Sequence, residues 1–128
     1  MAAPDMTGKA LSNVATEHVF KIRCTFAASS VVSYRSKDAT IAKTTTTTFT
    51  ITLPQTYAEI TEFSVGRKAA ASVAGLEYII TTNSVSTAGT LVLTSIIADG
   101  TATAPADGDV IYITLGVSRD ALNDRYVG

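Results

Sequence analysis

The stretch HVFKIRCTF, residues 18–26, shows the strictest alternation of apolar and polar side chains in this sequence. Its two faces differ in chemistry: Phe20, Ile22, Cys24 and Phe26 against Lys21, Arg23 and Thr25. Successive side chains of a strand point to opposite faces, so this period of two predicts a β-strand with one buried and one solvated face.

The same alternation returns further along the chain. In TTTTTFTITL, residues 44–53, threonines separate the large apolar residues, and Pro54 then ends the strand because it has no N–H to donate. Further strands are predicted within 27–36, 57–65, 76–82, 90–97 and 109–117. The last of these is largely apolar on both faces, so we expect it to be central in a sheet or to lie at an interface.

Six to eight short strands predict an all-β fold, either an antiparallel β-sandwich or a small barrel. The 21 threonines favour strands over helices, because β-branched side chains suit a pleated surface. Residues 1–17 are polar and rich in small side chains, so we expect an extended N-terminal arm before a single domain over residues 18–128. The predicted core contains Phe20, Ile22, Phe26, Phe49, Ile51, Leu53, Leu93 and Ile113.

Bulk properties exclude several classes of protein. A net charge of −1 gives no overall field that would draw the chain to nucleic acid or anionic lipid, so we expect neither as a partner. The single cysteine excludes an internal disulfide framework. No apolar run approaches the roughly 20 residues that span a bilayer. The first 18 residues lack the continuous apolar segment of a secretory signal, which predicts synthesis in the cytoplasm.

The sequence predicts no catalytic site. Nucleophilic catalysis needs a nucleophile and a base within hydrogen-bond reach, and His18 and Cys24 are the only pair of the Cys–His kind. They lie six residues apart on one predicted strand, roughly 20 Å at about 3.3 Å per residue. We therefore interpret Cys24 as a small buried hydrophobe and His18 as a surface or interface residue. The open alternative is an enzyme whose site forms across subunits.

The sequence predicts no metal or cofactor either. One His and one Cys are too few for a structural zinc site within one chain. Asp99, Asp107 and Asp109 could supply oxygen ligands for calcium, but the two Asp-Gly pairs are also ordinary turn chemistry, which is the reading we favour. Glu59 and Glu62 are expected to face opposite sides of a strand, which does not support a glycosidase pair.

Two compositional features leave alternatives open. The run Thr44–Thr48 fits a solvated strand face or a mobile entry to a strand, a subunit contact or, less readily, an array that orders water or ice. Charge is also unevenly distributed: Lys21, Arg23, Arg35, Lys37 and Lys43 come early, whereas Glu77, Asp99, Asp107 and Asp109 come late. This asymmetry fits a solvated surface, complementary patches between subunits, or RNA contact by the face of Lys21 and Arg23.

The second half of the chain resembles small structural proteins of tailed bacteriophages. The features are a strand that ends in Leu53-Pro54, a loop rich in Thr and Ala between two Asp-Gly pairs, and the final strand DGDVIYITLGV, residues 107–117. The resemblance implies a β-rich subunit bound to a capsid or another virion surface, usually as an oligomer, and it implies no site residue. Coat proteins of RNA phages are a further alternative, but those end in helices, and only residues 118–128 follow the last strand here.

We therefore expect a non-enzymatic virion protein on the capsid surface, which decorates or cements the capsid. Its expected partners are the major capsid protein and further copies of itself, with a trimer favoured and with the arm of residues 1–17 crossing onto a neighbour. The alternative is a carbohydrate-binding or tail-associated module that uses Tyr57, Tyr78 or Tyr126, since tyrosine offers an apolar ring face and a polar tip.

Overall fold

The computed structural model describes residues 17–27, 31–69 and 75–119. The described residues form strands and no helix, as the sequence predicted. The strands are β1 (Glu17–Ala27), β2 (Val31–Ser36), β3 (Thr40–Lys43), β4 (Thr48–Thr52), β5 (Glu59–Lys68), β6 (Glu77–Ser84), β7 (Thr90–Ile96) and β8 (Val110–Ser118). The arm predicted for residues 1–17 lies outside this part of the chain, except for Glu17, which begins β1.

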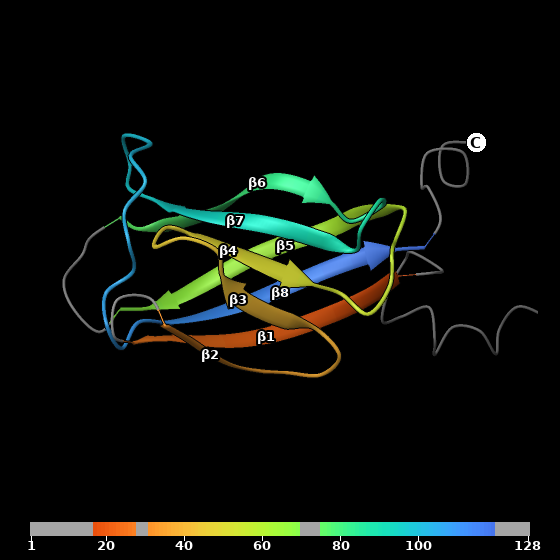
Figure 1. Cartoon of the computed structure of the whole chain (residues 1–128), viewed down its shortest axis with the longest axis horizontal. Coiled ribbons are helices and arrows are strands. Elements are labelled where there is room, and N and C mark those ends of the chain that lie inside the picture. The colour runs from red at the N-terminus through yellow and green to blue at the C-terminus, as the bar shows by residue number, and fades with distance from the viewer. Residues whose placement is uncertain (1–16, 28–30, 70–74, 120–128) are drawn as a thin grey trace, which may run out of the picture.

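The strands make two sheets that pack face to face as a β-sandwich (Figure 1). One sheet has the order β2-β1-β8-β5 and the other β3-β4-β7-β6, and every neighbouring pair is antiparallel. This arrangement confirms the predicted all-β fold.

Strand β8 is central in its sheet, between β1 and β5, which confirms the expectation from its two apolar faces. Its inward side chains, Ile111, Ile113, Leu115 and Val117, are at most 1% exposed. On its outer face Tyr112 is 46% exposed, so the apolar surface there is open to solvent in the single chain.

The core lies between the sheets and contains all eight residues predicted for it, each no more than 7% exposed. Aromatic rings join the two sheets at one end of this core. The ring centroids of Phe26 on β1 and Phe49 on β4 lie 4.9 Å apart, and Phe26 stacks at 6.0 Å on the nearly parallel ring of Tyr78 on β6. Phe26 of the first sheet therefore contacts two strands of the second sheet, β4 and β6.

The strand predicted over residues 44–53 starts only at Thr48, because residues 44–47 form the turn between β3 and β4, at the entry to that strand. Hydroxyl and amide groups of the run form hydrogen bonds with neighbouring threonines. The Thr48 amide donates to the Thr45 hydroxyl at 3.1 Å, and the hydroxyls of Thr44 and Thr50 lie 2.6 Å apart. Local side-chain acceptors of this kind compete with the ladder, which explains the later start of the strand.

Truncation of Phe26 tests the role of the ring cluster. We expect Phe26→Ala to lower the free energy of unfolding by about 3–5 kcal/mol, because it leaves a cavity where three rings meet. The control is Tyr34→Ala on edge strand β2, where the side chain is 44% exposed and the expected loss is below about 1 kcal/mol. Urea denaturation of both variants measures the difference, and equal losses would contradict the packing described here.

Candidate functional site

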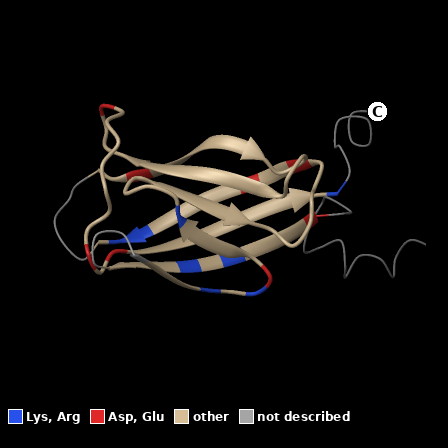
Figure 2. Ribbon diagram, viewed as in Figure 1, with Lys and Arg blue, Asp and Glu red and all other residues tan. Residues whose placement is uncertain are grey.

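The candidate site is the outer face of the β2-β1-β8-β5 sheet, which we call the charged face. Alternation along each strand sends one set of side chains into the core and the other set outward onto this face. The outward set is fixed by the register with β8, whose own outward residues are Val110, Tyr112, Thr114, Gly116 and Ser118. Figure 2 shows that the charges on this sheet are separated along the strands: basic residues lie toward one end and acidic residues at the other.

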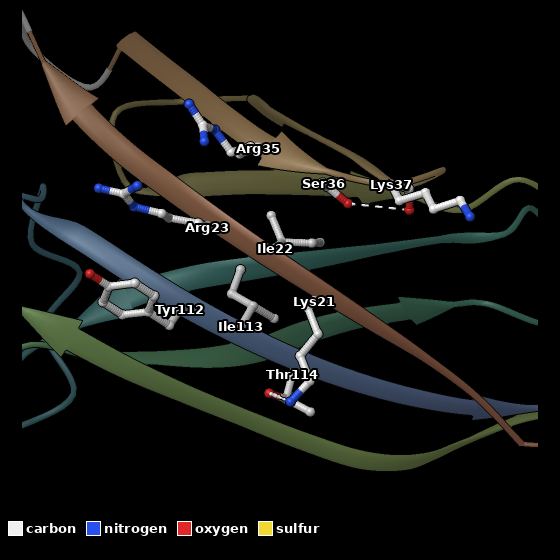
Figure 3. Close-up of a pocket in the computed structure, with 9 residues that line it drawn as sticks. All are labelled: Lys21, Ile22, Arg23, Arg35, Ser36, Lys37, Tyr112, Ile113 and Thr114. Carbon is white, nitrogen blue, oxygen red and sulfur yellow. Dashed lines mark hydrogen bonds between the residues drawn. The ribbon is translucent and has the colours of Figure 1, made fainter.

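The basic end is built from cross-strand neighbours. Arg23 on β1 lies directly between Arg35 on β2 and Tyr112 on β8, and Lys68 on β5 pairs with Val110. The Lys21 ammonium donates to the Thr114 hydroxyl at 3.3 Å. A shallow open groove on this end of the face is lined by Lys21, Arg23, Arg35 and Tyr112, among others (Figure 3).

The two arginines are an unfavourable pair in the single chain. Like charges directly opposite on neighbouring strands destabilise a sheet. Within the described residues no carboxylate lies within ion-pair distance of Arg23 or Arg35. The fold therefore tolerates a repulsion at an exposed surface, as is common where charge serves a binding partner.

The acidic end holds Glu17, Glu59 and Glu62. The sequence predicted that Glu59 and Glu62 face opposite sides of β5, and this is wrong. A β-bulge at Thr61 inserts one residue, so Glu59 pairs with Ser118 and Glu62 with Gly116, two positions on the same outer face. The pair therefore belongs to a surface of negative charge and not to a cleft with two walls.

Gly116 makes room for this end of the face. A β-carbon there would lie 2.7 Å from the Thr61 hydroxyl and 2.9 Å from the Glu17 carboxylate. These two groups are themselves hydrogen-bonded, since the Thr61 hydroxyl donates to Glu17 at 2.6 Å. The absence of a side chain at Gly116 lets β1 and β5 bring their polar groups together across β8.

Exposed apolar side chains accompany the charges. Val19 is 47% exposed between the two ends on β1, and Tyr112 is 46% exposed beside Arg23. Sequence reasoning found the basic cluster but missed the acidic end, because its three carboxylates come from distant segments. The bulge that aligns two of them leaves no mark in the pattern of apolar residues.

The structure does not bring His18 and Cys24 together. Cys24 is fully buried in the core, and burial raises the pKa of its thiol from 9.0 to about 12. His18 lies at the exposed opposite end of β1, where its ring is 5.9 Å from that of Tyr57. A nucleophile needs an accessible thiolate, so Cys24 cannot play that part within this chain.

The tyrosines predicted for carbohydrate binding do not form a surface. Tyr57 is 4% and Tyr78 7% exposed, so neither ring can serve as a platform, and Tyr126 lies outside the described residues. The Tyr78 hydroxyl is buried without a hydrogen-bond partner in the described chain. Burial, and secondarily the charge of Asp109, raise the pKa of Tyr78 above its usual value.

The three late aspartates serve separate structural roles. Asp99 accepts a hydrogen bond from the Thr101 amide at 2.9 Å, and bonding to Thr101 lowers the pKa of Asp99. Asp107 precedes Gly108, whose φ of 86° makes the turn before β8. Among described residues no group of three or more His, Cys, Asp or Glu is placed to hold a metal ion. The geometry agrees with the turn interpretation of the Asp-Gly pairs.

Asp109 is buried and forms an ion pair with Arg67 across β5 and β8. The Arg67 guanidinium donates to its carboxylate from Nη2 at 2.8 Å and from Nε at 3.2 Å. The Ala106 amide donates to the same oxygen at 3.3 Å. A buried carboxylate needs such partners, so Asp109 closes the core at this end and is not available to a partner protein.

The outer face of the second sheet is rich in threonine. Thr52 on β4 lies between Thr40 on β3 and Thr90 on β7, and Thr48 pairs with Thr94. The second threonine strand, β7, is less regular than residues 44–53, because Val92 lies between Thr90 and Thr94 on the same face. Hydroxyl groups bond to one another here, as Thr81 and Thr94 do at 2.9 Å.

The sequence matches no protein-family model, and neither curated proteins nor solved structures match it. In the described part of the chain no helix is long and apolar enough to cross a membrane.

The chemistry of Cys24 provides a test of its environment. We expect its alkylation by iodoacetamide at pH 8 to be at least about a hundredfold slower in the folded protein than in guanidinium chloride, because burial disfavours the thiolate and blocks access. Cys24 is the only cysteine, so mass spectrometry measures its labelling directly. Rapid stoichiometric labelling of the folded protein would show that the β1 core is open.

The Arg67–Asp109 pair gives a second test. We expect Arg67→Ala to cost about 3–5 kcal/mol of unfolding free energy, because it leaves the Asp109 carboxylate buried without its cation. The matched control is Lys68→Ala, the next residue on β5, whose exposed side chain is expected to contribute less than about 0.5 kcal/mol. Thermal or urea unfolding compares the two, and a small effect of Arg67→Ala would refute the structural role.

Proposed function

We propose that this chain is a non-enzymatic structural subunit of a virion, which decorates or cements a bacteriophage capsid as a homo-oligomer. The observation that carries the proposal is the charged face, where cations, carboxylates and exposed apolar side chains share the outer side of one sheet. Protein interfaces combine apolar contact with arranged charge, and a flat sheet suits a large partner better than a small ligand.

The positions of the side chains that could act in catalysis also support a structural, non-enzymatic role. Cys24 is buried, Asp109 is held by Arg67, and His18 contacts Phe20 and Tyr57 at the rim of the core. The virion assignment comes from the resemblance of residues 49–117 to small structural proteins of tailed phages. It makes the major capsid protein the partner, the capsid surface the location, and a trimer the favoured oligomer.

The carbohydrate-binding alternative loses the two predicted tyrosines that the structure describes, since both are buried. A glycan site on this domain would have to use Tyr34 or Tyr112, which are 44% and 46% exposed. Tyr112 is surrounded by cations, so such a site would favour acidic sugars.

Attachment to capsids tests the proposal. We expect the purified full-length chain to co-sediment with capsids assembled from the major capsid protein of the same genome. A chain that lacks residues 1–16 is expected to attach at least about tenfold more weakly. An arm of this kind gains contacts with a neighbour, and these contacts must exceed the conformational entropy that the arm loses when it is ordered. Circular dichroism checks that the shortened chain keeps its β-fold.

The outcomes separate two parts of this idea. A full-length chain that never sediments with the particles would overturn the proposed function. Equal attachment of the full-length and shortened chains would remove the cementing role of the arm and leave attachment through the folded domain.

A further inference from the structure

The charge pattern of the charged face is antisymmetric along its strands. On β1, Glu17 and Arg23 lie three residues to either side of Phe20, with Val19 and Lys21 between them. At about 3.3 Å per residue, each charged position lies roughly 10 Å from this midpoint. On β5, Glu59 and Glu62 precede Lys68 in the same sense, because β5 runs in the same direction as β1 in this sheet.

From this pattern we propose that the charged face binds the charged face of a second copy of the chain about a two-fold axis. The axis lies in the plane of contact, perpendicular to the strands. It stacks β1 on β1 and β5 on β5 of the second copy with strand directions reversed. This inference rests on the proposed function, that the chain is an assembly subunit, and names the partner of its charged face.

The reversal brings opposite charges together. Arg23 of one copy faces Glu17 of the other, and each such contact occurs twice because the interface is isologous. Arg35 lies one strand away from Arg23 and faces the same carboxylate diagonally. The midpoint of β8 is Leu115, which lies opposite Phe20. On β5, Lys68 pairs with Val110, five residues from this midpoint, and Glu59 pairs with Ser118, three residues from it. Lys68 of one copy is therefore offset by two residues from Glu59 of the other, a difference that a long lysine side chain can bridge.

The apolar residues fall where such a contact needs them. Val19 is the residue before the midpoint Phe20, so it packs near the midpoint of β1 in the second copy. Tyr112 lies over the row of the second copy that contains Ser118. Gly66 carries no side chain, and a β-carbon there would have no neighbour within 4 Å, so the sheets can approach closely at this position. Two sheets that pack face to face in this way lie about 10 Å apart.

The axis orientation follows from the charges. A two-fold axis parallel to the strands would place the basic end of each copy over the basic end of the other. Asp107 and Arg119 lie beyond the two ends, in the turn before β8 and directly after it, and neither is on the rows that pair. A second copy therefore supplies the carboxylates that the Arg23–Arg35 pair lacks among described residues of its own chain.

Charge reversal in the full-length chain tests this contact. We expect sedimentation velocity to show a salt-sensitive two-fold dimer, or a hexamer of three dimers if a separate three-fold contact exists. Arg23→Glu with Arg35→Glu reverses the cations that face Glu17 of the second copy, and Glu17→Lys reverses the carboxylate that these cations face. Each of these two variants is expected to associate at least about tenfold more weakly than the unchanged chain, because like charges then face each other.

Recombination of these variants provides the decisive measurement. An equimolar mixture of the Arg23→Glu, Arg35→Glu variant and the Glu17→Lys variant is expected to form a heterodimer, because each reversed charge then faces an opposite one. A chain that carries all three changes is expected to recover the homodimer. Glu77→Lys on β6 of the other sheet is the matched control, and it should leave the association unchanged. Circular dichroism and melting temperature confirm that each variant is folded.

Three results would overturn the contact: a chain that stays monomeric at all concentrations, an oligomer unaffected by either variant, or failure of the mixture to associate. Binding of an oligonucleotide by a monomeric chain, lost in the Arg23→Glu and Arg35→Glu variant, would instead assign the basic end to nucleic acid. None of these results depends on capsids, so attachment to particles can succeed where the two-fold contact fails.

Discussion

Strand β8 hydrogen-bonds to β1 on one side and to β5 on the other, and the two registers determine both the core side chains and the charged face of this sheet. On its inner face they align four fully buried aliphatic side chains with those of β1, which fills the space between the sheets. On its outer face the same registers set Arg23 beside Tyr112 and Glu62 beside Gly116. A slip by one residue would exchange the two faces, because the side-chain period is two. The core therefore holds the surface pattern in place.

The ends of this sheet are closed by different interactions. At the end where β8 begins, the buried Arg67–Asp109 pair and the stacked rings of Phe26 and Tyr78 seal the core. At the end where β8 finishes, Thr61 and Glu17 meet over Gly116 on the outer face. The inward Arg67 and the outward Lys68 are adjacent on β5, yet one is committed to Asp109 and the other is exposed. Position relative to the pleat, and not residue type, decides which charge is available to a partner.

The sequence predicted the core well because burial leaves a periodic trace. All eight predicted core residues are buried, since alternation in strands such as β1 depends only on neighbours in the chain. The charged face was less predictable for the opposite reason. Arg23 and Arg35 could be seen as basic, but their pairing depends on the β1–β2 register, and Glu59 joins Glu62 only through the bulge at Thr61. A bulge adds one residue without changing composition, so alternation alone assigns the two glutamates to opposite faces.

The edges of the sandwich bear on how copies could associate. Strands β5 and β6 are both edge strands on the same side of the sandwich, and each carries a bulge, at Thr61 and at Thr81. Bulges interrupt the regular row of N–H and C=O groups that an added strand would need, and they are a common device against edge-to-edge pairing. The outer face of the second sheet also offers little to bind, since threonine hydroxyls there bond to one another and its charge is low. With one edge irregular and one face neutral, the charged face is the surface on which association gains most from both charge and apolar contact.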